Sequence, residues 1–284
     1  MKKGKRTACA VAVVIFALII MSLIWGNSIP ELNTYIIASE TLPAAFDGFR
    51  IAHISDFHNA SVGKNNEKLL DMLRQSQPDI IAITGDFIDS RNTDMEISLR
   101  FAEKALEIAP CYYVSGNHEA RIGEYPVFRQ KLLEQGIMVL DESAMELIRG
   151  EDKITIIGVN DPAFFVKYLS GDTAAVMSDQ LQRLINPDDY TVLLSHRPEL
   201  FEVYGENNAD LVLSGHAHGG QFRIPFIGGL FAPNQGFFPA YDAGLFSENG
   251  TNMIVSRGIG NSIIPLRINN RPELILIELA HIAQ

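Results

Sequence analysis

Histidine and aspartate side chains recur in five short motifs along the chain, and this pattern indicates a metal site. Five of the seven histidines lie in the motifs, which are Asp56-Phe57-His58, Gly85-Asp86-Phe87-Ile88-Asp89, Gly116-Asn117-His118-Glu119, Ser195-His196 and Gly215-His216-Ala217-His218-Gly219-Gly220. Carboxylate, imidazole and carbonyl oxygen atoms are the ligands that hard and borderline divalent cations prefer. Two such cations about 3.5–4 Å apart can activate a water molecule and hold a phosphoryl group that undergoes in-line displacement.

Each motif ends an apolar, β-branched run of the kind that predicts a buried strand. The runs cover residues 49–55, 79–84, 111–115, 190–195 and 210–214. Because α/β sheets place their chemistry in loops at the ends of strands, we expect the motif side chains to meet at one edge of a sheet.

The remaining periodicity predicts the elements around these strands. Apolar spacing of three and four predicts helices over residues 65–76, 95–108, 125–135 and 177–185. A hairpin is predicted from 144–149 and 153–159, and further strands over 33–40, 253–256 and 273–279. Strands and helices alternate early and strands dominate late, which indicates an α/β or α+β fold.

The N-terminus has the pattern of a membrane anchor. Four basic residues among the first six precede a run of nineteen uncharged residues, 7–25, which is long enough to span a bilayer. A cleavable signal peptide would have a shorter apolar region and a small-residue cut site, whereas this run ends in Leu23-Ile24-Trp25. We therefore expect a cytoplasmic tail (1–6), one transmembrane signal anchor (7–25), a connector (26–32) and an extracytoplasmic catalytic domain (33–284) in the cell membrane.

The charge balance argues against a nucleic-acid partner. Beyond the four basic residues of the tail, 19 Lys and Arg residues stand against 34 Asp and Glu residues. Binding to duplex nucleic acid relies on neutralising phosphates with basic side chains, so no nucleic acid is expected as a partner.

The order and spacing of the five motifs resemble the calcineurin-like metallophosphoesterases over roughly residues 33–280. The stretches Gly-His-x-His-Gly-Gly-Gln at 215–221, Ala-Pro-x-Gln-Gly at 232–236 and Ser-Arg-Gly-Ile-Gly at 256–260 are similar to the membrane-associated bacterial branch, which includes phosphodiesterases and phosphatases. The resemblance implies a four-layer sandwich of two mixed β-sheets flanked by helices.

The resemblance also implies roles for particular residues. Two divalent cations (Mn, Zn, Fe or Co) would be held by Asp56, His58, Asp86, Asn117, His196, His216 and His218. Asp86 would bridge them, His118 would protonate the leaving oxygen, and Asp89 would orient His118. A carboxylate beside an imidazole favours the cation, so we expect a raised pKa for His118. The alternative for Asp89 is a loop-capping carboxylate.

Other residues near the motifs leave alternatives open. Arg197 follows the Ser195-His196 motif and would bind a phosphate oxygen of the substrate or form a surface ion pair. Glu119 is expected to brace its loop. The segment 219–246 is rich in glycine, proline and aromatic residues, and it either packs on its own sheet or forms a substrate wall or a bilayer-facing lip.

These observations predict a membrane-anchored two-metal hydrolase of phosphate esters. The resemblance implies attack by a metal-bridging hydroxide with His118 as general acid. A phosphodiesterase acting on a lipid or lipid-linked phosphate is the first interpretation, and a broad extracytoplasmic phosphomonoesterase is the second. A non-catalytic metal-binding scaffold is disfavoured, because every position that matches a ligand is occupied by a suitable residue.

Overall fold

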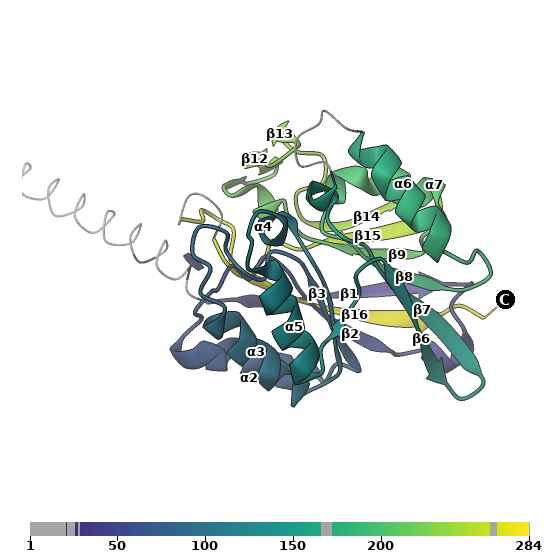
Figure 1. Cartoon of the computed structure of the whole chain (residues 1–284). Coiled ribbons are helices and arrows are strands. Elements are labelled where there is room, and N and C mark those ends of the chain that lie inside the picture. Colours follow the sequence, from purple (N-terminus) through teal and green to yellow (C-terminus); the bar gives the residue numbers. More distant parts are fainter. Residues whose placement is uncertain (1–20, 22–25, 28, 166–171, 262–265, 284) are drawn as a thin grey trace, which may run out of the picture.

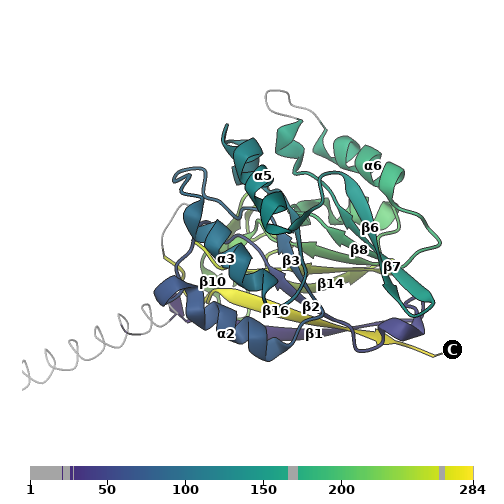
Figure 2. The same ribbon diagram turned by 60° about the horizontal axis from the view of Figure 1, so that its bottom comes forward.

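The computed structural model describes residues 21, 26–27, 29–165, 172–261 and 266–283. Its first sheet has six strands in the order β1 (Glu31–Ser39), β16 (Glu273–His281), β2 (Arg50–Ile54), β3 (Ile80–Thr84), β4 (Cys111–Val114) and β5 (Met138–Val139). All neighbours are parallel except β16 and β2, which are antiparallel. β16 lies between β1 and β2 with α2 and α3 alongside (Figure 2).

The second sheet is also six-stranded, in the order β14 (Gly244–Glu248), β15 (Thr251–Val255), β9 (Leu211–Ser214), β8 (Thr191–Leu194), β7 (Asp152–Gly158) and β6 (Ser143–Arg149). Its four central strands are parallel, and an antiparallel hairpin forms each edge. Both sheets are therefore mixed, as predicted.

Helices cover the outer face of each sheet (Figure 1). The first sheet carries α2 (Glu67–Ser76), α3 (Glu96–Leu106) and α5 (Tyr125–Gln135), and the second carries α6 (Thr173–Leu184) and α7 (Phe201–Glu206). One turn, α4 (Asn117–Ala120), lies at the end of β4, and the 3-10 turns are η1 (Ala44–Phe46), η2 (Lys64–Asn66), η3 (Pro162–Phe164), η4 (Pro198–Leu200) and η5 (His218–Gly220).

Three hydrophobic cores separate the four layers. Alternation along β2 shows the principle: Ile51 packs between the two sheets, whereas Ala52 and Ile54 pack under the helices. The third core lies beneath α6 and α7 and includes Leu181 and Tyr204. The predicted sandwich of two mixed sheets flanked by helices is confirmed for the described residues.

The five strands that precede the motifs all form, as β2, β3, β4, β8 and β9. β1 begins at Glu31, two residues before the predicted strand, so the connector is shorter than expected. The proposed anchor 7–25 lies outside the described residues except for Met21. Within the part of the chain that the structure describes, no helix has the length and apolar character to cross a membrane.

The glycine-rich segment after β9 folds into two small hairpins. They are β10 (Arg223–Ile224) with β11 (Gly228–Gly229), and β12 (Phe231–Ala232) with β13 (Gly236–Phe237). β12 and β13 lie at the end of the molecule opposite the C-terminus (Figure 1). The segment is therefore ordered, but its hairpins are too short for a strand period to show in the sequence.

Candidate metal centre

The first sheet brings three predicted ligands together at its carboxyl edge. Asp56 and His58 follow β2, and Asp86 follows β3. His58 Nε2 lies 3.9 Å from Asp56 Oδ1 and 3.7 Å from Asp86 Oδ2. All three residues have left-handed backbone conformations, with φ of 49° at Asp56, 47° at His58 and 49° at Asp86. Such strain is uncommon outside glycine and collects at functional sites, where the surrounding structure enforces it.

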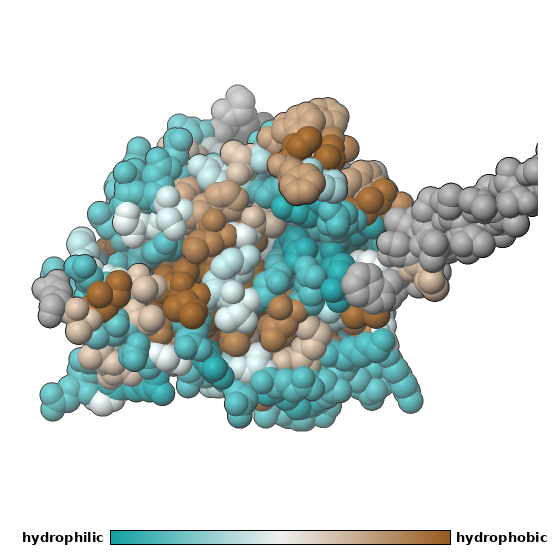
Figure 3. Space-filling view, turned by 180° about the vertical axis from the view of Figure 1, so that it is seen from behind, coloured by the Kyte–Doolittle hydropathy of each residue, from teal (hydrophilic) through white to brown (hydrophobic). Residues whose placement is uncertain are grey.

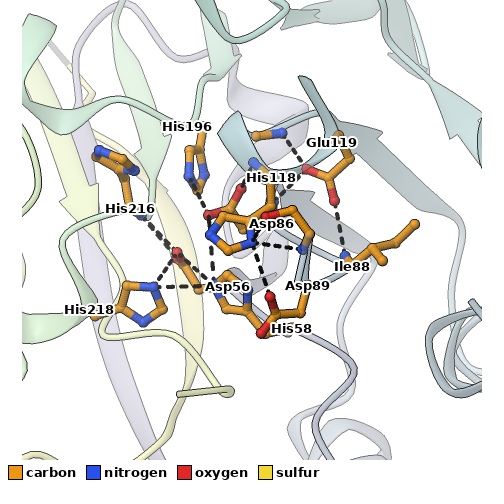
Figure 4. Close-up of polar contacts among 12 residues, drawn as sticks. Asp56, His58, Asp86, Ile88, Asp89, His118, Glu119, His196, His216 and His218 are labelled. Carbon is orange, nitrogen blue, oxygen red and sulfur yellow. Dashed lines mark hydrogen bonds and ion pairs between the residues drawn. The ribbon is translucent and has the colours of Figure 1, made fainter. Parts of the chain in front are cut away.

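The second sheet contributes three imidazoles to the same place (Figure 4). His196 follows β8, and its Nε2 lies 3.2 Å from Asp86 Oδ2. His216 and His218 both follow β9. The main-chain N–H of His216 donates to Asp56 Oδ2 at 2.9 Å, and Nε2 of His218 lies 3.2 Å from both Asp56 Oδ1 and His58 Nε2.

The ligand atoms fall into two buried sets that share one carboxylate. Asp56, His58, Asp86 and His218 form one set, in which the atoms lie within 4.8 Å of one another. Asp86, His196 and His216 form the second set within the same limit. Asp86 belongs to both sets, and a carboxylate that bridges two cations must lie in such a position.

Asn117 meets the second set through its side-chain amide. The amide nitrogen donates to His216 Nδ1 at 2.7 Å, and the amide oxygen accepts from the His118 N–H at 3.3 Å. Coordination of a cation by the Asn117 side-chain oxygen therefore stays a prediction. The donor set of carboxylates and imidazoles fits two divalent cations.

Neighbouring groups set the orientation of the ligands. His196 Nδ1 lies 2.7 Å from the Thr84 carbonyl oxygen and donates a hydrogen bond to it, which directs Nε2 towards the cluster. The Ser55 hydroxyl donates to Asp56 Oδ2 at 2.7 Å. Gly85 allows the β3 and β4 loops to approach, because a Cβ there would lie 2.6 Å from the Gly116 nitrogen.

Burial shapes the electrostatics of the cluster. It lowers the pKa of His216 and His218 well below the usual value, so both rings are neutral, which is the metal-binding form. Burial, together with the neighbouring Asp86 carboxylate, raises the pKa of Asp56 to about 6. Burial would also raise the pKa of Asp86, but His196 outweighs it and holds that pKa well below its usual range. Bound cations would relieve this concentration of buried carboxylates.

Glu119 braces the first-sheet loops through the main chain. Its side chain is fully buried, with Oε2 accepting from the N–H groups of Asp86 at 2.9 Å and Gly116 at 2.7 Å. Oε1 accepts from the N–H of Ile88 at 3.0 Å. The expectation that Glu119 braces its loop is confirmed, and the loop after β3 is included in the bracing.

Arg197 is buried beside the second set. Its Nε and Nη2 donate to the two carboxylate oxygens of Asp161 at 2.5 and 2.8 Å, and Nη1 donates to Asn234 Oδ1 at 2.9 Å. Nη1 also lies 3.2 Å from His216 Nε2. These are the contacts of a positioning residue rather than of a surface ion pair, and binding of substrate phosphate by Arg197 stays a prediction.

His118 faces the shared carboxylate, with its Nε2 4.0 Å from Asp86 Oδ2. Its Nδ1 accepts from the Ser90 N–H at 3.0 Å and lies 3.4 Å from Asp89 Oδ1. Asp89 also accepts from the Arg91 side chain, at 2.9 Å on Oδ1 and 2.6 Å on Oδ2. Its role as orienter of His118 stays a prediction.

The expected rise in the pKa of His118 is wrong. Burial lowers this pKa by more than the Asp86 and Asp89 carboxylates raise it. The sequence placed a carboxylate near the ring correctly, but it did not reveal how strongly the folded chain removes the ring from water.

A cavity of about 360 Å³ opens beside the cluster. Its lining includes His58, Asp89, Arg91, Asn27 and Asn261. It therefore reaches from a predicted metal ligand and the His118 neighbourhood to the first described residues of the chain. A larger cavity of about 500 Å³ lies at α7 and the β14–β15 turn and touches none of the predicted ligands.

Two mixed sheets with carboxylate and imidazole side chains at their strand ends define the class of α/β protein that holds a binuclear metal centre. The chain belongs to the calcineurin-like phosphoesterase family, which residues 49–220 match. It is accordingly a metal-dependent hydrolase of phosphoric esters.

Individual relatives extend the match beyond the family region. The chain is 28% identical to the metallophosphoesterase YkuE of Bacillus subtilis over 256 residues, which cover 88% of this chain and 85% of the relative. It is 30% identical to phosphodiesterase YaeI of Escherichia coli over 211 residues, 72% of each chain. The solved sulfate thiohydrolase SoxB of Thermus thermophilus shares the fold, with a TM-score of 0.52 at 12% identity, over 84% of this chain and 57% of that one.

Several residues at the site were not found by sequence reasoning. Asp161 and Asn234 hold Arg197, and the Ser90 N–H holds His118. Asn234 lies within the Ala-Pro-x-Gln-Gly stretch, so a motif did mark its neighbourhood. Asp161 caps η3 before Pro162, and this local role gives no sign that it also binds Arg197.

Proposed function

We propose that this chain is a membrane-anchored phosphodiesterase that acts on a lipid or lipid-linked phosphate. In this proposal residues 7–25 form the anchor and the hydrolase domain lies outside the cytoplasm. The observation that carries the reaction is the pair of buried ligand sets sharing Asp86, with His118 and an open cavity beside them.

The residues that would hold the cations are those the sequence predicted: Asp56, His58, Asp86 and His218 for one, and Asp86, Asn117, His196 and His216 for the other. Two divalent cations supply charge neutralisation of phosphoryl oxygens and a water of lowered pKa. The chain itself fixes these side chains through Glu119 and Arg197, which leaves little reorganisation for the moment of reaction.

His118 is the residue that we assign to proton delivery. When the ring is neutral, Nδ1 accepts from the Ser90 N–H, so the proton resides on Nε2, which faces the cluster. When the ring is cationic, the Asp89 carboxylate, 3.4 Å away, is available to Nδ1. Both protonation states thus have a partner, as proton transfer to a leaving oxygen requires.

The lipid substrate is supported by the position of the cavity. Its lining includes both His58 and Asn27, and Asn27 lies two residues beyond the proposed anchor. A substrate held there would lie between the catalytic residues and the membrane. Similarity to a protein named phosphodiesterase over 72% of this chain supports the diester preference.

A broad phosphomonoesterase is the second candidate, because an anchor also serves enzymes that act on soluble esters outside the cell. The lining of the open cavity includes Arg91, whose positive charge would attract small anionic esters, and this favours the phosphomonoesterase.

The test is hydrolysis by the full chain in detergent, loaded with Mn²⁺, of nitrophenyl phosphate, its bis ester and dispersed phospholipids. Asp86→Asn and addition of a chelator serve as controls, and both should abolish turnover. We expect cleavage of the bis ester and of phospholipid. Turnover of the monoester alone would establish the phosphomonoesterase instead, and bound metal without turnover of any substrate would return the scaffold interpretation.

A further inference from the structure

Large apolar side chains gather at one corner of the molecule, where Figure 3 shows a hydrophobic surface. We name this surface the apolar lip and define it by six exposed residues: Phe226, Ile227, Phe231, Phe237, Phe238 and Ile268. Phe226 is fully exposed and Phe237 is 71% exposed. Apolar side chains scattered singly need no explanation, but a contiguous group marks an interaction site.

Two of these residues combine an exposed ring with a left-handed backbone. Phe226 and Phe238 have left-handed backbones, with φ of 69° and 54°. This conformation is strained for a bulky residue, and glycine or asparagine would adopt it more readily. Strained backbone collects at functional sites, and here it presents two exposed rings to the surroundings of the protein.

The lip is held rigidly on the metal-site loop. Asp242 Oδ2 accepts from the Gly229 N–H at 2.5 Å and from Arg223 Nη1 at 2.9 Å. Asn234, between β12 and β13, accepts from Arg197 and lies 2.9 Å from His216 Nε2. The rings therefore have a set position relative to the predicted ligands.

The chain enters the folded domain next to the base of the lip. Asn27 Nδ2 donates to the Arg267 carbonyl at 2.9 Å, and Asn27 Oδ1 accepts from the Arg267 N–H at 2.6 Å. The adjacent Ile268 carbonyl accepts from the Arg223 N–H, in the first strand of the lip, at 3.0 Å. An uncharged run of bilayer length, 7–25, ends two residues before Asn27.

We propose that the apolar lip is a bilayer-contacting surface, whose phenylalanine rings insert between lipid headgroups beside the 7–25 segment. The inference rests on the proposed anchoring and deepens the proposed function, because it places the mouth of the 360 Å³ cavity at the membrane surface. Aromatic rings favour this interfacial zone, where apolar area is removed from water without crossing the membrane.

A bilayer is favoured over a second copy of the chain. Excess acidic residues outside the tail would make two domains repel each other. In addition, an anchor formed by residues 7–25 would hold this corner at the membrane surface, since only residue 26 separates that run from Asn27.

The experiment is quenching of a single tryptophan by brominated lipid in the full chain, reconstituted in phosphatidylcholine vesicles. Trp25 is the chain's only tryptophan, so Trp25→Phe gives a dark background. Phe226→Trp then places a reporter on the lip. Ile148→Trp is the matched control, because Ile148 is 72% exposed on the β6–β7 hairpin, far from β12 and β13 in Figure 1.

We expect blue-shifted emission from Phe226→Trp and loss of most of that emission in brominated vesicles, with no change for Ile148→Trp. Phe237→Trp provides a second reporter in case the first variant misfolds, and retained metal content reports folding in each. Unquenched emission at water-like wavelength would overturn the proposal. Blue-shifted but unquenched emission would also overturn it, since the ring would then be packed against protein. No turnover is needed, so this outcome is independent of whether the lipid hydrolase assignment holds.

Discussion

The two sheets contribute different chemistry to one site. The predicted ligands of the first sheet are Asp56, Asp86 and Asn117 with a single imidazole, His58, whereas the predicted ligands of the second sheet are all imidazoles. Each half alone would be incomplete: the first concentrates buried carboxylates, and the second holds imidazoles without a carboxylate ligand. Packing of the two sheets against each other therefore completes the site.

The halves are also braced in different ways. Glu119, in the first half, accepts from main-chain N–H groups of two loops. Arg197, in the second, donates to side chains, one of which lies on the glycine-rich segment. Geometry in the first half is therefore set by the backbone, and in the second by a network of side chains.

Asp86→Ala should disrupt both halves of the site at once, because Asp86 is the carboxylate common to both ligand sets. We expect loss of metal content and a fall in turnover of about a thousandfold or more on every ester, since the cations supply several kcal/mol of transition-state stabilisation. Metal analysis and nitrophenyl ester kinetics measure this. Two metals retained per chain would contradict a bridging Asp86.

His118→Ala should leave both halves intact and remove only proton delivery. We expect normal metal content, a loss of about a hundredfold or more on alkyl esters, and a much smaller loss on nitrophenyl esters, whose leaving group needs no proton. Equal losses on the two kinds of ester would show that His118 is not the general acid.

Arg197→Met should damage the second half selectively. The buried Asp161 carboxylate would lose its partner, which typically costs about 3–5 kcal/mol of unfolding free energy. We expect weakened binding of one metal, by about 10–100-fold, as for loss of other groups that orient ligands. Urea unfolding and metal titration measure the two effects.

The double variant Arg197→Met with Asp161→Asn is the matched control for that experiment. Removing the unpaired carboxylate should restore much of the stability but not the metal affinity. Recovery of both would mean that Arg197 acts only through folding stability and does not position His216.

Glu119→Ala should damage the first half through its backbone. Three buried N–H groups would lose their acceptor, and each unsatisfied group costs about 1–3 kcal/mol, so we expect a loss of about 3 kcal/mol or more in unfolding free energy. Glu119→Gln, which keeps one accepting oxygen, should lose less. Equal urea midpoints for the two variants would argue against bracing of the main chain.

The smallest expected effect is on the pH dependence of stability, and it arises in the first sheet. Burial lowers the pKa of His53, on β2, to about 3, and the described strands of the second sheet contain no histidine. The unfolded chain binds a proton near pH 6.5 while the folded chain does not, so stability falls as the pH drops from 6.5 towards 3. We expect His53→Gln to lose about 2 kcal/mol less than the parent between pH 7 and pH 5. Parallel stability curves would exclude this role.

Much of the fold could be predicted because its signals are local. The runs before the motifs became β2, β3, β4, β8 and β9, since strands buried on both faces require continuous apolar sequence. α7 and β14 were missed: α7 is too short to show a helical period, and β14 has mostly exposed or half-exposed residues.

The candidate site divides in the same way. Asp56 and His58, or His216 and His218, lie close in sequence, so their convergence follows from one strand end. The partners of Arg197 lie 36 and 37 residues away, and only the folded chain brings them together. No spacing rule reports such contacts.

By itself the sequence determined the residue types of the site, the strands that carry them and the anchor-like N-terminal run, because each depends on short-range pattern. The tertiary structure alone decided which partners hold Arg197, which buried charges hold the loops, and the direction of the His118 pKa shift. These depend on distances and burial between segments far apart in the chain, which the sheet packing sets and the order of residues does not state.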